Sequence, residues 1–316
     1  MRWKKGTGMI LSLCLCAAAF GTSCGKHSAK GQEERAGSQP GELAKEPEDA
    51  AGGPSEEQGQ ADGRQDKPAE QGLEDLRCQE ETAADQDAQT ALAGASSKIA
   101  EIKELPSYSI VDMAGWDETS VHALFYAQEI SDEIYAKING CSYRQNEDIA
   151  LSELRYLRVL HMGMDGETRV GELIVHESVS QDILEIMEAL YWAGYPIEKM
   201  RLVEYYEGDD VKSMEDNNTS AFNYRTIAGT DKRSNHSYGM AIDINPLYNP
   251  YVKVKSDGSV MVSPQSGSRY ADRETDFPYK IERGGLCYNL FVEHGFTWGG
   301  DWSSVKDYQH FEKSGA

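Results

Sequence analysis

The stretch that decides the fold is residues 234–245, which read SNHSYGMAIDIN. Three apolar residues occupy every second position of its second half: Met240, Ile242 and Ile244. Because successive side chains of a β-strand point to opposite faces, this alternation predicts a strand with one face in the core. Asp243 then projects from the opposite face, and a turn at Gly239 would bring His236 back beside it.

A second polar cluster stands further along the chain, where residues 296–312 read FTWGGDWSSVKDYQHFE. Together with His236 and Asp243, His310 would complete a set of two histidines and one aspartate. Such a set leaves a fourth position for water, which is typical of catalytic zinc, whereas structural zinc sites are usually closed by four protein ligands. Asp307 would share a face with His310 on a helical turn but not in an extended segment.

Three motifs follow one another in this order: S-x-H-x-x-G-x-A-x-D at 234–243, W-G-G-x-W at 298–302 and D-x-x-H-F-E at 307–312. Together they resemble the motifs of a family of bacterial cell-wall peptidases. This family comprises zinc-dependent D-alanyl-D-alanine carboxypeptidases, also called VanY-type, and L-alanyl-D-glutamate endopeptidases. The resemblance extends upstream through residues 195–225 and covers roughly residues 150–312.

The resemblance implies a role for each matching position. His236, Asp243 and His310 correspond to the zinc ligands of the family. Asp307 matches the acidic residue that takes a proton from the zinc-bound water and then protonates the leaving amine. Arg225 resembles the arginine that binds the substrate carbonyl and the tetrahedral oxyanion. The expected cofactor is therefore Zn²⁺, which lowers the pKa of bound water to about 7, and the expected substrates are the stem peptides of peptidoglycan.

Several of these residues have a second interpretation. Ser234 is expected to help shape the substrate site. Trp298 and Trp302 are expected to contact substrate, although both could instead pack in the core. Asp307 could be an acid in the first turn of a helix, and Arg225 could be the structural ion-pair partner of a nearby acid.

The apolar pattern predicts a single α+β domain over residues 150–316, with a mostly antiparallel central sheet flanked by helices. Apolar residues at helical spacing predict helices over three ranges: 118–138, 179–194 and 285–294. Short apolar or alternating runs predict strands over three further ranges: 171–176, 200–206 and 239–245.

Residues 1–24 combine early cations with a short apolar run, which predicts a secretory signal peptide. Its end resembles a bacterial lipobox, in which Cys24 would be lipidated and would anchor the chain to the outer face of the cytoplasmic membrane. Cleavage elsewhere would give a secreted protein. Residues 25–104 hold 19 Asp+Glu against 9 Lys+Arg and no aromatic residue, so we expect a disordered acidic linker. Residues 105–149 are expected to form a helical collar.

The formal net charge of the chain is −22, which excludes a purely electrostatic nucleic-acid binder. We expect a monomer whose partners are stem peptides and, through the lipid anchor, the membrane. Cys141 and Cys287 could form a disulfide or remain free thiols. The competing function is a non-catalytic wall-binding lipoprotein that retains the peptidase fold. A metal-scavenging lipoprotein ranks last because the chain lacks a His-rich tract.

Overall fold

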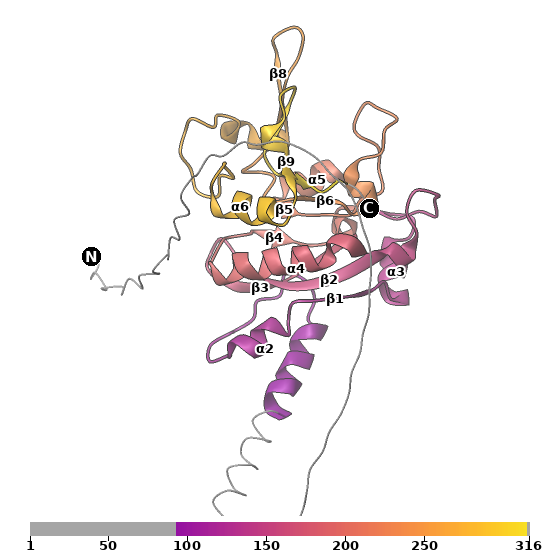
Figure 1. Ribbon diagram of the computed structural model, residues 1–316, viewed down its shortest axis with the longest axis vertical. Coiled ribbons are helices and arrows are strands. Elements are labelled where there is room, and N and C mark those ends of the chain that lie inside the picture. The colour runs from indigo at the N-terminus through magenta and orange to yellow at the C-terminus, as the bar shows by residue number, and fades with distance from the viewer. Residues whose placement is uncertain (1–92, 315–316) are drawn as a thin grey trace, which may run out of the picture. The chain divides into compact units, whose positions relative to one another are not determined.

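The computed structural model describes residues 93–314 (Figure 1). The predicted signal peptide, the Cys24 lipidation site and residues 25–92 of the predicted linker lie outside the described residues. Within the described part, none of the helices is both long and apolar enough to cross a membrane.

A three-stranded antiparallel sheet forms the first layer of the fold. It contains, in spatial order, β1 (Tyr126–Glu129), β2 (Leu154–Met162) and β3 (Thr168–His176). The β2–β3 register runs from Leu154 opposite His176 to Met162 opposite Thr168. All nine residues of β3 are buried, so this strand has both faces inside the protein.

Helix α4 (Glu177–Trp192) follows β3 directly and lies across the sheet (Figure 1). Its buried residues recur at helical spacing and include Val179, Ile183, Ile186, Met187 and Leu190. The side chain of His176 caps the helix by accepting a hydrogen bond from the Ser178 N–H. Gly194 follows the helix with φ +65°, a left-handed conformation that favours glycine after a helix end. The helix predicted over 179–194 is confirmed.

The polar motifs lie on a smaller antiparallel sheet. It contains, in spatial order, β6 (Ala241–Asp243), β11 (His310–Glu312) and β9 (Thr297–Trp298). Helix α6 (Leu286–Glu293) contributes Phe291 to its core, where the ring stacks on that of Phe311 with centroids 4.1 Å apart. The helix predicted over 285–294 and the strand predicted within 239–245 are therefore both present.

The other elements are short. A third antiparallel sheet contains, in spatial order, β10 (Lys306–Asp307), β7 (Tyr251–Val254) and β8 (Val260–Ser263). A parallel pair consists of β4 (Lys199–Met200) and β5 (Asn218–Thr219). Further α-helices are α2 (Glu118–His122), α3 (Asp132–Ile138) and α5 (Asp210–Glu215), and residues 93–104 are also helical. Short 3₁₀ helices are η1 (Leu151–Glu153), η2 (Val203–Tyr206), η3 (Asn235–Tyr238), η4 (Gln265–Tyr270) and η5 (Gly299–Asp301). The predicted α+β class with mostly antiparallel pairing is confirmed.

The single helix predicted over 118–138 is wrong. Helices α2 and α3 are separated by β1, which pairs antiparallel with β2, so the predicted helical collar over 105–149 is partly strand. The apolar residues at helical spacing serve two separate hydrophobic clusters, with Val121 in one and Ile134 in the other. Tertiary packing thus overrides a local helical period.

Two other predicted boundaries also differ from the structure. The strand predicted over 200–206 is mostly the 3₁₀ helix η2. The predicted disordered linker ends too late, because residues 93–104 are helical. In that helix Ile102 is buried in the main core, and Ile99, three residues earlier on the same face, packs against that core. Composition averaged over the whole linker hid this local apolar face.

The two cysteines of the folded part are both free thiols. Cys287 is buried on α6, and this burial raises the pKa of its thiol to about 12. Cys141 is half-buried. The free-thiol alternative therefore holds in this structure.

Gly239 offers a test of how the two main sheets join. It has φ +66°, and a Cβ at this position would lie 2.5 Å from the His176 backbone nitrogen. We expect Gly239→Ala to lower the free energy of unfolding by more than the ~1–3 kcal/mol that a left-handed non-glycine residue costs, because the steric clash adds to that strain. The measurement is urea unfolding of the full-length chain.

Gly194→Ala is the matched control for this substitution. Gly194 has nearly the same φ, +65°, but a Cβ there would have no neighbour within 4 Å. It should therefore show the backbone strain alone. Equal losses for the two variants would contradict the close approach at Gly239.

Candidate metal centre

His236 is placed by the short helix η3. The Ser234 hydroxyl caps this helix by accepting a hydrogen bond from the His236 N–H. Gly239 ends it in the left-handed conformation, so the chain turns back at once into β6. His236 is 3% exposed, and its Nδ1 lies 2.5 Å from the carbonyl oxygen of Ala221. The turn predicted at Gly239 therefore places the ring in a fixed, buried position.

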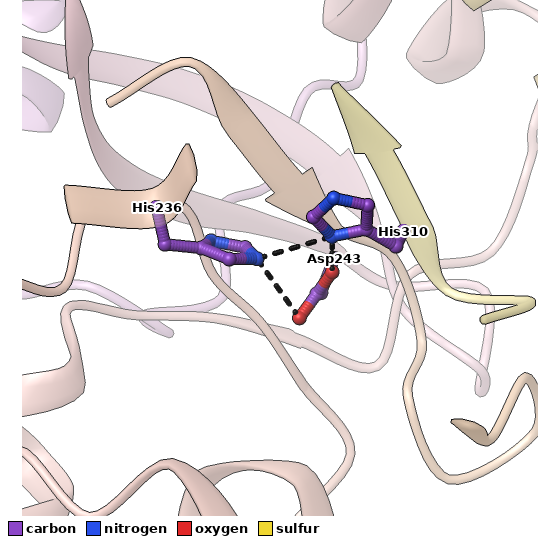
Figure 2. Close-up of side chains that lie close together, drawn as sticks. All are labelled: His236, Asp243 and His310. Atoms are coloured by element: carbon purple, nitrogen blue, oxygen red, sulfur yellow. Dashed lines mark hydrogen bonds and ion pairs between the residues drawn. The ribbon is translucent and has the colours of Figure 1, made fainter. Parts of the chain in front are cut away.

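Asp243 and His310 are brought together by strand pairing. Asp243 of β6 lies directly opposite His310 of β11, and opposed residues of an antiparallel pair share a face. Their side chains meet with 2.9 Å between Asp243 Oδ1 and His310 Nδ1. His236 Nε2 lies 3.3 Å from Asp243 Oδ2 and 3.2 Å from His310 Nδ1 (Figure 2).

One ligand atom from each of these three buried side chains lies within 4.8 Å of the other two. The structure therefore assembles the three residues that the sequence predicted as metal ligands. Nitrogen, nitrogen and carboxylate oxygen at this spacing form a donor set that suits zinc.

The outer partners of the two imidazoles determine which ring nitrogens face the centre. His310 Nε2 lies 3.1 Å from Glu312 Oε2, and His236 Nδ1 faces a carbonyl oxygen, which can only accept. Each outer nitrogen is therefore assigned as the N–H donor. The inner nitrogens, Nε2 of His236 and Nδ1 of His310, then turn lone pairs toward the Asp243 carboxylate. Two lone pairs and an anion converging in a buried space require a cation or a proton between them.

The electrostatics of the site favour positive charge at its centre. Burial alone would raise the pKa of Asp243, but the adjacent imidazoles of His236 and His310 outweigh burial and hold that pKa well below its usual range. Burial would lower the pKa of His310, but its hydrogen bonds with Asp243 and Glu312 raise it to about 10. The same field that favours a proton on His310 would favour a divalent cation.

Asp307 stands at the edge of this centre, on β10. Asp307 ends β10, residues 308–309 form a bend, and His310 begins β11, so no helical turn joins the two residues. The interpretation of Asp307 as a first-turn helix acid is therefore wrong. Its Oδ1 accepts a hydrogen bond from Gln309 Nε2 at 3.1 Å. Burial, together with the charge of Asp243, raises the pKa of Asp307.

Gly299, the first glycine between the two tryptophans, lies where a side chain would not fit. A Cβ on Gly299 would lie 2.6 Å from the Asp307 carbonyl oxygen and 3.3 Å from His310 Cβ. Only a residue without a side chain therefore allows η5 to pack this closely against the strands that carry these two residues.

The two tryptophans that were predicted to contact substrate lie in different environments. Trp298 is 5% exposed, belongs to the main core and donates its Nε1–H to the Tyr308 carbonyl, which favours the packing alternative. Trp302 is half-buried, and its ring centroid lies 5.3 Å from that of His310. Trp302 thus lies beside the centre, and its contact with substrate stays a prediction.

Arg225 has a protein partner in this structure. Its Nη2 lies 2.8 Å from Asp210 Oδ2, in the first turn of α5, which favours the ion-pair alternative. Its backbone carbonyl accepts hydrogen bonds from the Ser234 N–H and the Ser237 hydroxyl. The backbone of Arg225 therefore holds the segment that carries His236, and this contact does not involve its guanidinium.

Sequence reasoning missed two residues that hold His310 in place. Glu312 accepts from His310, and Asn235 Nδ2 in turn donates to Glu312 Oε2 at 2.5 Å. The sequence contained a signal for Glu312. Residues two apart on a strand share a face, and His310 and Glu312 are both in β11.

A comparison with known families points to the same segment. Residues 228–313 match the family model of D-alanyl-D-alanine carboxypeptidase. This match confirms the family resemblance predicted from the motifs, and it supports a peptidase. It spans His236, Asp243, His310 and Asp307, but it leaves out Arg225. No solved structure gave a significant match to the chain.

Glu312 provides a test of the outer contacts. We expect Glu312→Ala to weaken the affinity for Zn²⁺ by about 10- to 100-fold, because His310 loses the acceptor that orients its ring. Glu312→Gln should lose less, since its amide oxygen can still accept from Nε2–H. Affinity is measured by competition with a chromogenic chelator.

Glu293→Ala is the control, because Glu293 is an exposed acid at the end of α6. Its Zn²⁺ affinity should equal that of the wild type. Equal affinities for all the variants would show that Glu312 does not orient a metal ligand.

Proposed function

We propose that this protein is a zinc-dependent peptidase that hydrolyses an amide bond in the stem peptide of peptidoglycan. The observation that carries the proposal is the buried cluster of His236, Asp243 and His310, whose inner atoms converge as a three-ligand donor set. The family match adds that relatives of this segment act on D-alanyl-D-alanine.

His236, Asp243 and His310 would hold the metal. When bound, zinc supplies Lewis-acid chemistry, in which it acidifies water and polarises a carbonyl group. The protein would contribute the geometry, since strand pairing and the contacts of Glu312 and Ala221 hold the three side chains in place before any ligand arrives.

Asp307 is the proposed general base. Its carboxylate would accept a proton from the attacking water and then deliver that proton to the nitrogen of the leaving amine. A pKa raised by burial and by Asp243 suits this role, because a base is most effective when its pKa approaches the working pH. Trp302, beside His310, is the proposed wall of the substrate site.

The proposed activity is tested by incubating the full-length chain with purified peptidoglycan fragments and following the products by mass spectrometry. Loss of a terminal D-Ala identifies a carboxypeptidase, and cleavage between L-Ala and D-Glu identifies an endopeptidase. We expect EDTA to abolish cleavage and added Zn²⁺ to restore it. His236→Ala should lose metal and activity together, whereas Asp307→Ala should keep the metal and lose about 10²- to 10⁴-fold in rate.

Asp276→Ala is the matched control for Asp307→Ala, because the Asp276 side chain is 99% exposed. It should cleave like the wild type. A zinc-loaded wild type that binds the wall but leaves every fragment intact would contradict the peptidase proposal. The non-catalytic wall-binding protein would then take its place.

We also propose that the chain is exported and anchored to the outer face of the cytoplasmic membrane through a lipid on Cys24. The support is the sequence of residues 1–24, with its early cations, short apolar run and lipobox-like end. In a bacterial host, Cys24→Ser should move the protein from the membrane fraction to the medium or the wall fraction. A variant that stays in the membrane fraction would rule out this anchor.

A further inference from the structure

The hairpin formed by β7 and β8 is joined directly to the candidate metal centre. Strand β10 pairs with β7, so that Asp307 lies opposite Tyr251 and Lys306 lies opposite Val252. Beyond the pairing with β10, the hairpin strands β7 and β8 project away from the rest of the fold (Figure 1). The proposed general base therefore stands at the base of a projecting arm.

The strand register divides the arm into two unlike faces. Opposed residues share a face, and the face alternates along each strand. The face that continues from Asp307 carries Tyr251, Lys253, Met261 and Ser263. The other face carries four valines in two cross-strand pairs, Val252 with Val262 and Val254 with Val260.

The first of these faces is open and begins at the site. Lys253 is exposed, Met261 is 38% exposed, and Tyr251 is half-buried. Burial chiefly, with a contribution from the charge of Asp307, raises the pKa of Tyr251, which places the phenol within electrostatic reach of that carboxylate. At about 3.3 Å per residue, Lys253 stands roughly 7 Å further out along the strand than Tyr251.

The charge on this face differs from the charge around the metal centre. Asp243, Asp307 and Glu312 gather at the centre, where the two imidazoles and a bound cation would offset their charge, whereas Lys253 places a separate positive charge further out on the hairpin. Among residues 93–314, Lys253 forms no ion pair with an acid. Its ammonium is thus available to a ligand.

We propose that the Tyr251–Lys253–Met261 face is a docking surface for the carboxylate-bearing part of an extended peptide substrate. This inference rests on the proposed function, because it takes the substrate to be a stem peptide. Lys253 pairs with a carboxylate of the peptide at a distance from the reacting bond, and Met261 and Tyr251 contact its apolar parts. The arm therefore affects binding and not the chemical step.

The test uses the zinc-loaded full-length chain and two synthetic peptides. One is the pentapeptide L-Ala–γ-D-Glu–L-Lys–D-Ala–D-Ala with both of its amino groups acetylated, which carries two carboxylates and no ammonium group. The other has, in addition, both of these carboxylates converted to amides and is uncharged. KM and kcat are measured where the peptide is cut, and Kd by calorimetry where it is not. A failure of cleavage thus tests the proposed function, whereas the arm is judged by how KM or Kd depends on Lys253.

We expect Lys253→Glu to raise KM or Kd for the anionic pentapeptide about five- to tenfold, as reversal of an exposed ion pair allows, with kcat within twofold of wild type. The amidated peptide should show little difference. Raising the ionic strength should shrink the effect. Met261→Lys adds a cation opposite Lys253 on the same face and should tighten binding of the anionic peptide, a gain that misfolding cannot produce.

Two controls separate this surface from general effects. Lys137→Glu on α3 makes the same change in net charge at an exposed position outside the hairpin, and Val254→Thr alters the opposite face of the hairpin. Both should leave KM or Kd within twofold of the wild type. The proposal is overturned if Lys253→Glu matches Lys137→Glu, or if it weakens the amidated peptide as much as the anionic one.

Discussion

The pairing of β6 with β11 is the constraint on which the rest of the site depends. It buries an aspartate directly opposite a histidine, and two polar side chains held this close in the core must satisfy each other. The next pair in the register is apolar: Ile242 lies opposite Phe311, and both are fully buried. A slip of one residue would exchange the two sets, placing apolar side chains at the centre and charges in the core.

The burial of so many ionisable groups is tolerated because each has a specific partner. Asp243 lies between two imidazoles, each imidazole has an outer acceptor, and Glu312 is held by Asn235. Burying these groups without their partners would cost several kcal/mol for each charge. Burying this network lowers the stability of the fold, but it holds the site in an arrangement that need not change when a ligand binds.

Local patterns in the sequence were sufficient for the elements whose partners are nearby in the chain. Helix α4 carries its apolar face and its terminating glycine in one continuous stretch, and so it was predictable. Strand β1 was not, because its four residues become a strand only by pairing with β2, some thirty residues later. The helix over residues 93–104 was missed for a related reason. Its two isoleucines, Ile99 and Ile102, pack against a core formed by residues far away in the chain.

The same distinction holds for the site. The clustering of His236, Asp243 and His310 was predictable because zinc chemistry and the family resemblance both select these residues by type. The pairing of Arg225 with Asp210 was not, because it depends on where α5 lies in three dimensions. Trp298 and Trp302 could not be distinguished by residue type. Trp298 lies in the core because it pairs with Phe311 between β9 and β11.

Asp243 and His310 lie 67 residues apart in the chain, and the projecting hairpin and α6 both belong to the segment between them. A cation held by both residues would close this long segment into a loop, and it would bind the folded chain but not the unfolded one. Metal supply would then govern the lifetime of the protein as well as its activity. Where zinc is scarce, more of the chain would open at any moment and be available to proteases, so unloaded copies would be cleared first.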